Sequence, residues 1–563
     1  MLPLLQIKNL SISFAQDKKT VHAVKNISFN LPSGKITALI GESGSGKSVT
    51  ALSFLQLLPP QAQLLGNMFF SEDGMTTIDL LNTSTAKMQA LRGNKIAMIF
   101  QEPMTSLNPV HTCGAQVIEA LMLHKKFNKR EARDAAIELF KKVELPLPEQ
   151  MINRYPHQIS GGQKQRVMIA MAMSCNPALL IADEPTTALD VRVQKKILLL
   201  LKKLQSENGM GILLITHDLS LVSDVADEIA VMYKGEIVEN GVANEILAAP
   251  HHIYTKALLA CLPTAASKGK RLAIIDDYII GNVSSHVTSK KSELNVSPEV
   301  VLKVENLSVY FPSKKNIFGK ISEHYKAVDD VSFTVNKNEI VGLVGESGCG
   351  KTTLGRALLH LIKPTAGNIY FSGNNIAKAT KAQMRLLRKE LQIVFQDPYG
   401  SLNPRLSIGD AIMESMKVHN PSSTQKSRKE KAVHLLEEVN MSSVFFNRYP
   451  HQFSGGQRQR ICIARALAVE PNFLIFDESV SALDVSVQAQ VLNLINDLKA
   501  AHNFTSIFIS HNLAVIHYIS DRIMVMKSGK IIETGTAHEI IFSPQQAYTK
   551  ELLNAIPNSK LKY

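Results

Sequence analysis

Short apolar runs alternate with helix-like repeats along the chain. Residues 36–40, 179–182 and 212–215 are almost entirely apolar, which is typical of strands buried on both faces. A helix is predicted to begin near Lys47, and helical spacing returns ahead of residues 208 and 209, at Val193, Ile197, Leu200, Leu201 and Leu204. Strands that alternate with helices indicate an α/β core with a mostly parallel sheet.

The chain contains the same pattern twice. GESGSGKS at residues 41–48 returns as GESGCGKT at 345–352, FQEPMTSLNP at 100–109 as FQDPYGSLNP at 395–404, and YPHQISGGQKQR at 155–166 as YPHQFSGGQRQR at 449–460. The offset is 304 residues for the first pair, 295 for the second and 294 for the third. Such self-similarity indicates a duplicated domain. We predict a first domain at 1–262, a linker at 263–299 with a short packed segment at 272–280, and a second domain at 300–563.

Composition and charge narrow the class of protein. The 563 residues, 45% hydrophobic and 20% charged, are enough for at least two folded domains. No run reaches the roughly 18 apolar residues that span a bilayer, and the N-terminus lacks the pattern of a secretion signal, so we expect the protein to work in the compartment where it is made.

Cysteine spacing and net charge exclude further classes. Five scattered cysteines without CxxC spacing argue against a disulfide framework and a structural zinc site, and fit a reducing cytoplasm. The net charge of +13 divides into +3 for residues 1–262, +2 for 263–298 and +8 for 299–563. This spread excess favours a solvated surface over a nucleic-acid or anionic-lipid site.

Each copy carries a phosphate-binding loop of the form GxxxxGK[ST] between a predicted strand and a predicted helix. Its glycines allow backbone N–H groups to surround phosphates, and the helix N-terminus adds positive potential. Lys47 and Lys351 are expected to reach the β- and γ-phosphates, and Ser48 and Thr352 to bind Mg²⁺. Two such loops at equivalent places predict ATP as the ligand and Mg²⁺ as its cofactor.

Acidic pairs follow a second apolar strand in both copies, within LLIADEP at 179–185 and FLIFDES at 473–479. Asp183 and Asp477 are placed to complete the Mg²⁺ shell. Glu184 and Glu478 are predicted to orient and polarise the attacking water. At the end of the next strand in each copy, His217 and His511 are predicted to contact the γ-phosphate or that water.

A second anion site is predicted in each copy at the SGGQ sequence. Ser160, Gly161 and Gly162, and likewise Ser454, Gly455 and Gly456, begin a predicted helix with small residues. We expect the glycine loop of one copy to face the SGGQ of the other across a sandwich of two nucleotides.

Together these motifs resemble the ATP-binding cassette (ABC) ATPase family over nearly the whole chain. SGGQ lies between the phosphate loop and the strand that ends in Asp-Glu, with Gln101 or Gln396 and a downstream histidine in each copy. The phrases quoted above, with YTKALLACLP at 254–263 and YTKELLNAIP at 548–557, resemble the dipeptide, oligopeptide and nickel uptake subfamily, and the tandem form is similar to the fused ATPase subunits of microcin C-type peptide and glutathione importers.

The resemblance implies two P-loop ABC domains, each with a mostly parallel sheet core, a helical subdomain and an antiparallel β subdomain. The implied catalytic residues are Glu184, His217, Glu478 and His511, and the implied metal-site residues are Ser48, Gln101, Asp183, Thr352, Gln396 and Asp477. The implied nucleotide contacts are Phe14, Gly41, Ser43, Gly44, Ser45, Gly46, Lys47, Ser48, Gln101, Ser160, Gly161, Gly162, Gln163 and Asp190 in the first copy, and Phe311, Gly345, Ser347, Gly348, Cys349, Gly350, Lys351, Thr352, Gln396, Ser454, Gly455, Gly456, Gln457 and Asp484 in the second.

Several positions depart from the family pattern. Ser479 replaces the usual proline found at Pro185, and the signature begins with Ile159 or Phe453 in place of leucine. Neither copy carries a cysteine-rich extension, which predicts that there is no iron–sulfur cluster. Cys349, inside the second loop, is a common small-residue variant that we expect to be chemically incidental, with sensitivity of that site to thiol reagents as the alternative.

The resemblance implies an ATPase that powers import. Its expected partners are two integral-membrane permeases and, indirectly, an extracytoplasmic binding protein, with no nucleic acid, and its expected place is peripheral, on the cytoplasmic face of a bacterial inner membrane. A tandem cassette that acts on ribosomes and RNA is the alternative, although the short Ser-rich linker is unlike the long charged helix of that class. A DNA-repair cassette would need zinc-binding CxxC pairs, and an exporter would carry fused membrane spans. Dipeptides, longer peptides, glutathione, peptide-like antibiotics and nickel chelates all remain open as cargo.

Overall fold

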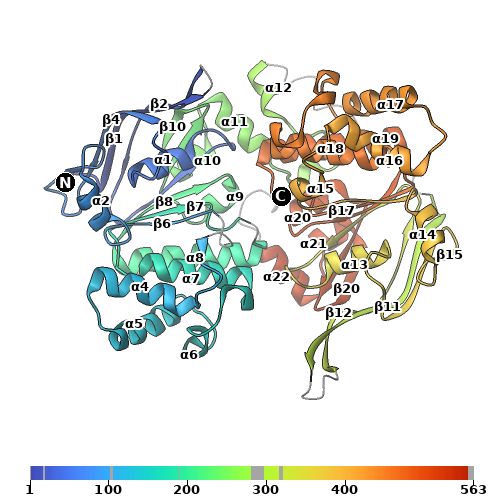
Figure 1. Cartoon of the computed structure of the whole chain (residues 1–563), viewed down its shortest axis with the longest axis horizontal. Helices are drawn as coiled ribbons and strands as arrows, with labels where there is room; N and C mark the ends of the chain where they lie inside the picture. The colour runs from blue at the N-terminus through green and yellow to red at the C-terminus, as the bar shows by residue number, and fades with distance from the viewer. Residues whose placement is uncertain are drawn as a thin grey trace. The chain divides into compact units, whose positions relative to one another are not determined.

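The structure, a computed structural model, describes residues 2–16, 19–101, 106–187, 189–280, 297–315 and 321–555. These residues form two compact units, the first ending at Leu259 and the second beginning at Ala260 (Figure 1). Each unit holds one copy of the repeated pattern.

The first unit contains two sheets. The antiparallel sheet has the order β2-β1-β4-β5, and the larger sheet has the order β10-β9-β3-β8-β7-β6, in which only β10 is antiparallel to its neighbour. The strands are β1 (Leu5–Gln16), β2 (Lys19–Leu31), β3 (Ile36–Ile40), β4 (Ala62–Phe70), β5 (Ile78–Asp79), β6 (Ile96–Ile99), β7 (Leu179–Asp183), β8 (Gly211–Thr216), β9 (Glu228–Tyr233) and β10 (Glu236–Val242).

The second unit repeats this topology strand for strand. Its sheets have the orders β12-β11-β14-β15 and β16-β17-β18-β13-β19-β20. The strands are β11 (Val300–Lys315), β12 (Ile321–Asn336), β13 (Ile340–Val344), β14 (Ala366–Phe371), β15 (Asn374–Asn375), β16 (Leu391–Val394), β17 (Phe473–Asp477), β18 (Thr505–Ile509), β19 (Arg522–Lys527) and β20 (Lys530–Thr536).

The continuous apolar runs are explained by burial on both faces of the larger sheet. In β7 and β8, Leu179, Ile181, Leu213 and Ile215 pack with the antiparallel sheet, whereas the alternate residues, 180, 182, 212 and 214, pack with the helices on the other face. Because side chains alternate between the faces of a strand, both sets of positions must be apolar.

The helices of the first unit include a group away from the antiparallel sheet, in which α4, α5, α6 and α7 pack on one another (Figure 1). The helices are α1 (Lys47–Phe54), α2 (Thr85–Leu91), α4 (Cys113–Lys125), α5 (Lys129–Lys142), α6 (Pro148–Met151), α7 (Gly161–Met173), α8 (Val191–Asn208), α9 (Leu219–Val222), α10 (Ala243–Ala248) and α11 (Ile253–Ala260), with a 3₁₀ turn η1 (Pro156–Gln158).

The second unit forms the equivalent group from α16, α17 and α18. Its helices are α12 (Ile275–Ile280), α13 (Lys351–Leu358), α14 (Lys381–Leu387), α15 (Pro398–Ser401), α16 (Ile408–His419), α17 (Gln425–Glu438), α18 (Gly455–Leu467), α19 (Val485–His502), α20 (Leu513–Ile519), α21 (Ala537–Phe542) and α22 (Ala547–Ala555), with 3₁₀ turns η2 (Ala265–Ser267), η3 (Ser443–Asn447) and η4 (Pro450–Gln452). The predicted fold class is therefore confirmed: two tandem α/β domains, each with a helical and an antiparallel β subdomain.

Strand order brings the candidate residues to one edge of each large sheet. β3 lies between β9 and β8, and β7 lies between β8 and β6, all parallel. The loop after β3, the acidic pair at the end of β7, His217 after β8 and Gln101 after β6 therefore meet at the carboxyl edge, where sheets of this kind bind ligands.

Candidate active sites

Both phosphate loops connect a central strand to the N-terminus of a helix. Gly46 caps α1 with φ of 106°, and Gly350 caps α13 with φ of 111°. A Cβ atom at these positions would lie 2.6 Å from the carbonyl oxygen of Ala23 and 2.0 Å from that of Ala327, so only glycine fits. The other predicted loop residues, Gly41, Ser43, Gly44 and Ser45 in one copy and Gly345, Ser347, Gly348 and Cys349 in the other, lie in these same connections.

The two loop lysines are buried and oriented by the loops themselves. Lys47 Nζ donates to the carbonyl oxygens of Gly41 at 2.8 Å and Glu42 at 2.7 Å. Lys351 Nζ donates to the carbonyl oxygens of Gly345 and Glu346 at 2.8 and 2.9 Å. Each ammonium group is therefore held within the concave loop that would surround the phosphates.

The predicted metal residues pair across the sheet edge. Ser48 Oγ donates to Asp183 Oδ1 at 3.1 Å, and Thr352 Oγ1 donates to Asp477 Oδ1 at 3.0 Å. Burial, with the charge of the adjacent Glu184, raises the pKa of Asp183 to about 6, and burial also raises the pKa of Asp477. A buried carboxylate whose charge lacks solvation, next to a hydroxyl oxygen, suits a hard cation such as Mg²⁺.

Among the described residues, no group of three or more His, Cys, Asp or Glu side chains is arranged to hold a metal ion. One carboxylate and one hydroxyl per copy match the way Mg²⁺ binds nucleotides, with phosphate oxygens and water as the remaining ligands. Gln101 and Gln396, also predicted at the metal, direct their amide nitrogens to Glu184 and Glu478 at 2.9 and 3.0 Å.

Glu184 is fixed from several sides. It has a left-handed φ of 45°, its N–H donates to the carbonyl oxygen of Ile215 at 2.9 Å, and its carboxylate lies 3.1 Å from His217 Nδ1 and accepts from Thr187 Oγ1 at 2.9 Å. Although burial alone would raise it, the pKa of Glu184 is lowered to about 2 by the hydrogen bond and charge of His217, with help from Thr187 and Lys47. The carboxylate is therefore held ionised, next to the predicted phosphate site.

Glu478 has the same left-handed backbone, but its contact with histidine is longer than that of Glu184. Its φ is 47°, and its carboxylate lies 3.6 Å from His511 Nδ1 and 4.0 Å from Lys351 Nζ. These groups lower its pKa against the effect of burial. Ser481, which corresponds to Thr187, donates instead to the main-chain carbonyl of Glu478 at 2.8 Å. The two carboxylates are thus equally placed along the chain but not equally held.

Ser479 stands where the first copy has Pro185, and its burial is energetically unfavourable. Ser479 is 3% exposed, and within the described part of the chain its buried hydroxyl has no hydrogen-bond partner. A buried hydroxyl without a partner is unfavourable by about 1 to 3 kcal/mol. The loop beside Glu478 is therefore less favourable locally than its counterpart.

Thr187 was missed in the sequence because a threonine three residues after a glutamate carries no recognisable signal. We expect Thr187→Val to slow hydrolysis at the first site roughly 5- to 10-fold, because a hydrogen bond to a charged acceptor is lost. Residual turnover in chains that also carry Glu478→Gln would measure this effect on the first site. Ser481→Ala with Glu184→Gln is the matched control and should change turnover less than about twofold; equal losses in both would refute a positioning role for Thr187.

Each SGGQ sequence forms a helix N-terminus closed by a capping box. Ser160 Oγ accepts from the N–H of Gln163, while Gln163 Oε1 accepts from the N–H of Ser160, and Ser454 and Gln457 form the same pair. The glutamines at 163 and 457 thus bond to their own helix ends. Gly161 and Gly455 open these helices, with N–H groups available to an anion.

The second glycine of the signature is also required by packing. A Cβ at Gly162 would lie 2.8 Å from Val193 Cγ1, and one at Gly456 would lie 2.1 Å from Val487 Cγ1. These contacts pack each signature helix, α7 or α18, against the helix that follows the acidic pair. That helix is α8 in the first copy, which begins after Asp190, and α19 in the second copy, which begins after Asp484. Asp190 caps α8 by accepting from the N–H of Val193 at 3.0 Å, whereas Asp484 caps α19 without a side-chain bond of that kind.

The predicted adenine-stacking residues lie in the antiparallel sheets. Phe14 in β1 is half-buried against the core, and Phe311 in β11 is exposed. The structure adds Tyr325, which pairs with Phe311 across β11 and β12 and donates its hydroxyl to the carbonyl oxygen of Gly348 at 3.0 Å. Val21 occupies the corresponding place beside Phe14, so this cross-strand pair is aromatic on both strands in the second copy and on one strand in the first.

The structure favours a chemically incidental Cys349 over the alternative of a thiol-sensitive second site. Cys349 is buried, and burial raises the pKa of its thiol, which lowers the population of the reactive thiolate. We expect N-ethylmaleimide to leave ATPase activity unchanged in the folded chain, while all five cysteines react after denaturation. Loss of activity together with a mass increase on Cys349 would contradict this expectation.

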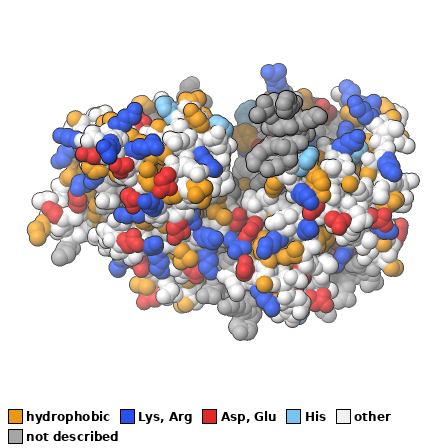
Figure 2. Space-filling model, turned by 90° about the horizontal axis from the view of Figure 1, so that it is seen from below, with side chains coloured by type: hydrophobic (Ala, Val, Ile, Leu, Met, Phe, Trp, Pro, Cys, Tyr) orange, Lys and Arg blue, Asp and Glu red, His pale blue; other side chains and the backbone are white. Residues whose placement is uncertain are grey.

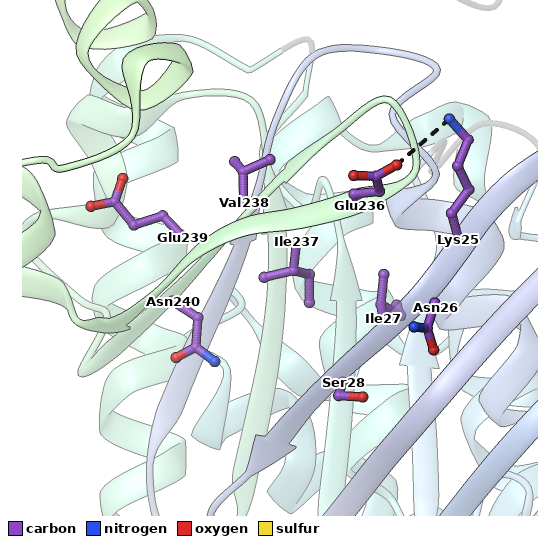
Figure 3. Close-up of a pocket in the computed structure, with 9 residues that line it drawn as sticks. All are labelled: Lys25, Asn26, Ile27, Ser28, Glu236, Ile237, Val238, Glu239 and Asn240. Carbon is purple, nitrogen blue, oxygen red and sulfur yellow. Dashed lines mark ion pairs between the residues drawn. The ribbon is translucent and has the colours of Figure 1, made fainter.

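An open pocket in the first unit does not belong to these sites. It lies between β2 and β10, where Lys25 and Glu236 form an ion pair of 3.9 Å (Figure 3). Its lining residues run along 25–28 and 236–240 and include none of the nucleotide motifs.

Comparison with protein families matches both copies. The model described as ABC transporter matches residues 24–187 and 328–481, and the model described as oligopeptide/dipeptide transporter, C-terminal region, matches residues 238–281 and 532–562. These matches cover the phosphate loops, the signature helices and the acidic pairs.

Curated relatives are similar to this chain along nearly its whole length. The chain is 45% identical over 562 residues to the glutathione import ATP-binding proteins GsiA of Shigella sonnei (strain Ss046) and Escherichia coli (strain K12), covering 98% of this chain and 89% of each relative. A solved structure, the dimeric post-hydrolysis state of the ATP-binding cassette MJ0796 bound to ADP and Pi, is 31% identical, with a TM-score of 0.38 over 42% of this chain and 98% of that chain.

These relatives fit an importer subunit and do not fit the ribosome alternative. On the face seen in Figure 2, Lys and Arg side chains are interspersed with Asp and Glu side chains. The family model matches both copies, the relatives are similar over nearly the whole chain, and the site geometry agrees with both findings. The chain therefore belongs to the ABC transporter family, as an ATP-hydrolysing subunit with two fused ATP-binding domains.

Proposed function

We propose that this ATPase powers an importer of peptides or peptide-like substrates through two ATP sites, each completed by the opposite copy. The import function rests on the relatives and the family models. The claim of two sites rests on one observation: both copies hold a buried loop lysine, a hydroxyl–aspartate pair and a glutamate–histidine pair in equivalent places. Neither copy has lost a residue that hydrolysis needs.

The first site would combine Lys47, Ser48, Gln101, Asp183, Glu184 and His217 with Ser454 and Gly456. The second would combine Lys351, Thr352, Gln396, Asp477, Glu478 and His511 with Ser160 and Gly162. We assign the first domain to 1–262, the linker to 263–299 and the second domain to 300–563. Asp190 and Asp484 would communicate between the sites.

Hydrolysis in this scheme needs positioning more than covalent chemistry. Water attacks the γ-phosphorus, the bond to the β–γ bridging oxygen breaks, and ADP, phosphate and a proton are released. Ionised Glu184 and Glu478 orient the water, while Lys47 and Lys351 balance charge on the phosphate oxygens. Mg²⁺, when bound at Ser48–Asp183 and Thr352–Asp477, neutralises further phosphate charge.

ATP would close the two copies on each other, and release of phosphate would reopen them. We propose that permeases receive this motion through the segments after Gln101 and Gln396. In the second copy that segment is α15 (Pro398–Ser401), and in the first copy residues 102–105 lie outside the described residues.

The partners would be two integral-membrane permeases and, indirectly, an extracytoplasmic binding protein, with the chain peripheral to the inner membrane. No helix among the described residues is both long and apolar enough to cross a bilayer. The relatives named for glutathione import make a small thiol peptide the first cargo to test.

Affinity purification of the tagged chain from membranes in mild detergent tests this function. We expect two multi-span permeases to remain attached and to be identified by mass spectrometry. A double Lys47→Ala, Lys351→Ala chain serves as the control for nucleotide-dependent association. Recovery of ribosomes with no membrane protein would overturn the importer proposal.

A further inference from the structure

A segment that follows the first copy in sequence is docked on the second unit. Residues 268–272, here called the latch segment, lie between η2 (Ala265–Ser267) and α12 (Ile275–Ile280). The family model for the C-terminal region of the first copy extends to residue 281, yet the second unit begins at Ala260. The latch segment therefore belongs to one copy by sequence and to the other by contact.

The centre of the contact is a buried asparagine. Asn493 on α19 is 2% exposed, and its Oδ1 accepts from the N–H of Leu272 at 2.9 Å while its Nδ2 donates to the carbonyl oxygen of Leu272 at 2.8 Å. Tyr518 donates its hydroxyl to the carbonyl oxygen of Lys270 at 3.1 Å and to Asn493 Oδ1 at 3.0 Å. A buried amide inside a helix is costly unless both of its ends are bonded, and here the latch segment satisfies both.

Two charged contacts flank this centre. Lys268 Nζ donates to the carbonyl oxygens of His517, at 3.0 Å, and Ser520, where α20 ends and its carbonyl groups lack helical partners. Arg271 Nη1 lies 2.9 and 2.8 Å from the two carboxylate oxygens of Asp497. The latch segment thus meets the second unit through both backbone hydrogen bonds and charged side-chain contacts.

Among the described residues, the first copy lacks the side chains that form this docking surface. At the positions 294 residues earlier, Asn493, Asp497 and Tyr518 correspond to Leu199, Lys203 and Asp224. Leu199 is 48% exposed, so the same helix face is open to solvent in the described first unit. The shared fold therefore does not by itself require the asparagine, the aspartate and the tyrosine that hold the latch segment.

We infer that the latch segment shortens the tether between the copies and so favours their ATP-driven closure. Lys268 follows Leu259, the last residue of the first unit, by nine residues, whereas β11 of the second unit begins 41 residues after Leu259. Effective concentration falls with about the 3/2 power of tether length, so docking raises it roughly 10-fold. This inference rests on the proposed function, because it matters only where each ATP site needs both copies.

Lys268→Ala in the full chain tests the inference, with Lys270→Ala as the matched control. Lys270 is exposed, and it contacts Tyr518 through its main-chain carbonyl oxygen, which alanine keeps. Both variants therefore remove one positive charge from the same segment, but only Lys268→Ala removes a side-chain contact with the second unit. We expect Lys268→Ala to speed hydrogen exchange across residues 268–280 and to raise the ATP concentration for half-maximal hydrolysis up to about 10-fold, with kcat at saturating ATP unchanged. Lys270→Ala should do neither.

Asn493→Leu, which installs the residue of the first copy, should give the larger change in exchange and in half-saturation. Unchanged exchange in both Lys268→Ala and Asn493→Leu would show that the segment is not held as described. Faster exchange without a shift in half-saturation would overturn the tether role. If the wild-type chain has no ATPase activity, the proposed function fails, while protection of the Leu272 amide still reports on docking.

Discussion

Replacing Glu184 and Glu478 together with glutamine is expected to lower the steady-state ATPase rate at least about 100-fold, while ATP still binds. Both carboxylates are held ionised at the sheet edge, and glutamine keeps their shape but removes the negative charge that orients the water. Phosphate release at saturating ATP measures the effect. Because the loop lysines are untouched, binding of a fluorescent ATP analogue should change less than about threefold.

The single variants test whether both sites hydrolyse. We expect Glu184→Gln and Glu478→Gln each to remove about half of the turnover or more. Glu245→Gln, an exposed position on α10, is the control and should leave turnover unchanged. If Glu184→Gln has no effect while Glu478→Gln abolishes activity, the claim of two working sites is wrong.

Lys47→Ala combined with Lys351→Ala is expected to weaken ATP binding about 100-fold, which is the largest loss of affinity that we expect from any pair of substitutions in the chain. Each lysine is about 5% exposed or less and is the charged group that lies inside its loop. Its removal takes a cation away from the phosphates and leaves two carbonyl oxygens without that donor, at Gly41 and Glu42 or at Gly345 and Glu346. Isothermal titration with ATP measures the change.

Lys35→Ala provides the matched control for this loss of positive charge. Lys35 precedes β3 in the same domain and is exposed, pairing at 3.0 Å with Glu228. Exposed pairs contribute less than about 1 kcal/mol, so ATP affinity and the midpoint of thermal unfolding should both stay close to those of the wild type. A similar loss of affinity in Lys35→Ala would mean that net charge, and not the loop geometry, controls binding.

The phosphate loops and the fold class were predictable because their signals are local. A glycine that must take a left-handed φ, a lysine next to it and an apolar strand before it lie within about a dozen residues, and their chemistry does not depend on distant contacts. The continuous apolar runs also revealed strands buried on both faces, as β7 and β8 are. Each of these local patterns also occurs twice in the chain, once in each copy.

Other features depended on residues far apart in the chain. Gln101 and Glu184, 83 positions apart, meet because β6 and β7 are adjacent parallel strands. The place of Tyr325 at the second phosphate loop follows from the β11–β12 pairing, and no spacing rule connects it with Gly348. Thr187 donates to the carboxylate of Glu184 whereas Ser481 donates to the main-chain carbonyl of Glu478, a difference that their shared spacing does not predict.

By itself, the sequence determined that this protein is a duplicated α/β ATPase with two phosphate loops, two acidic pairs and two signature helices, since each depends on residue types at short spacing. Only the tertiary structure decided how tightly each glutamate is held, that the thiol of Cys349 is buried, and where Leu272 docks on Asn493, 221 positions away. Burial and hydrogen-bond partnership are properties of the packed chain. They follow from strand order and helix packing, which a linear pattern specifies only in outline.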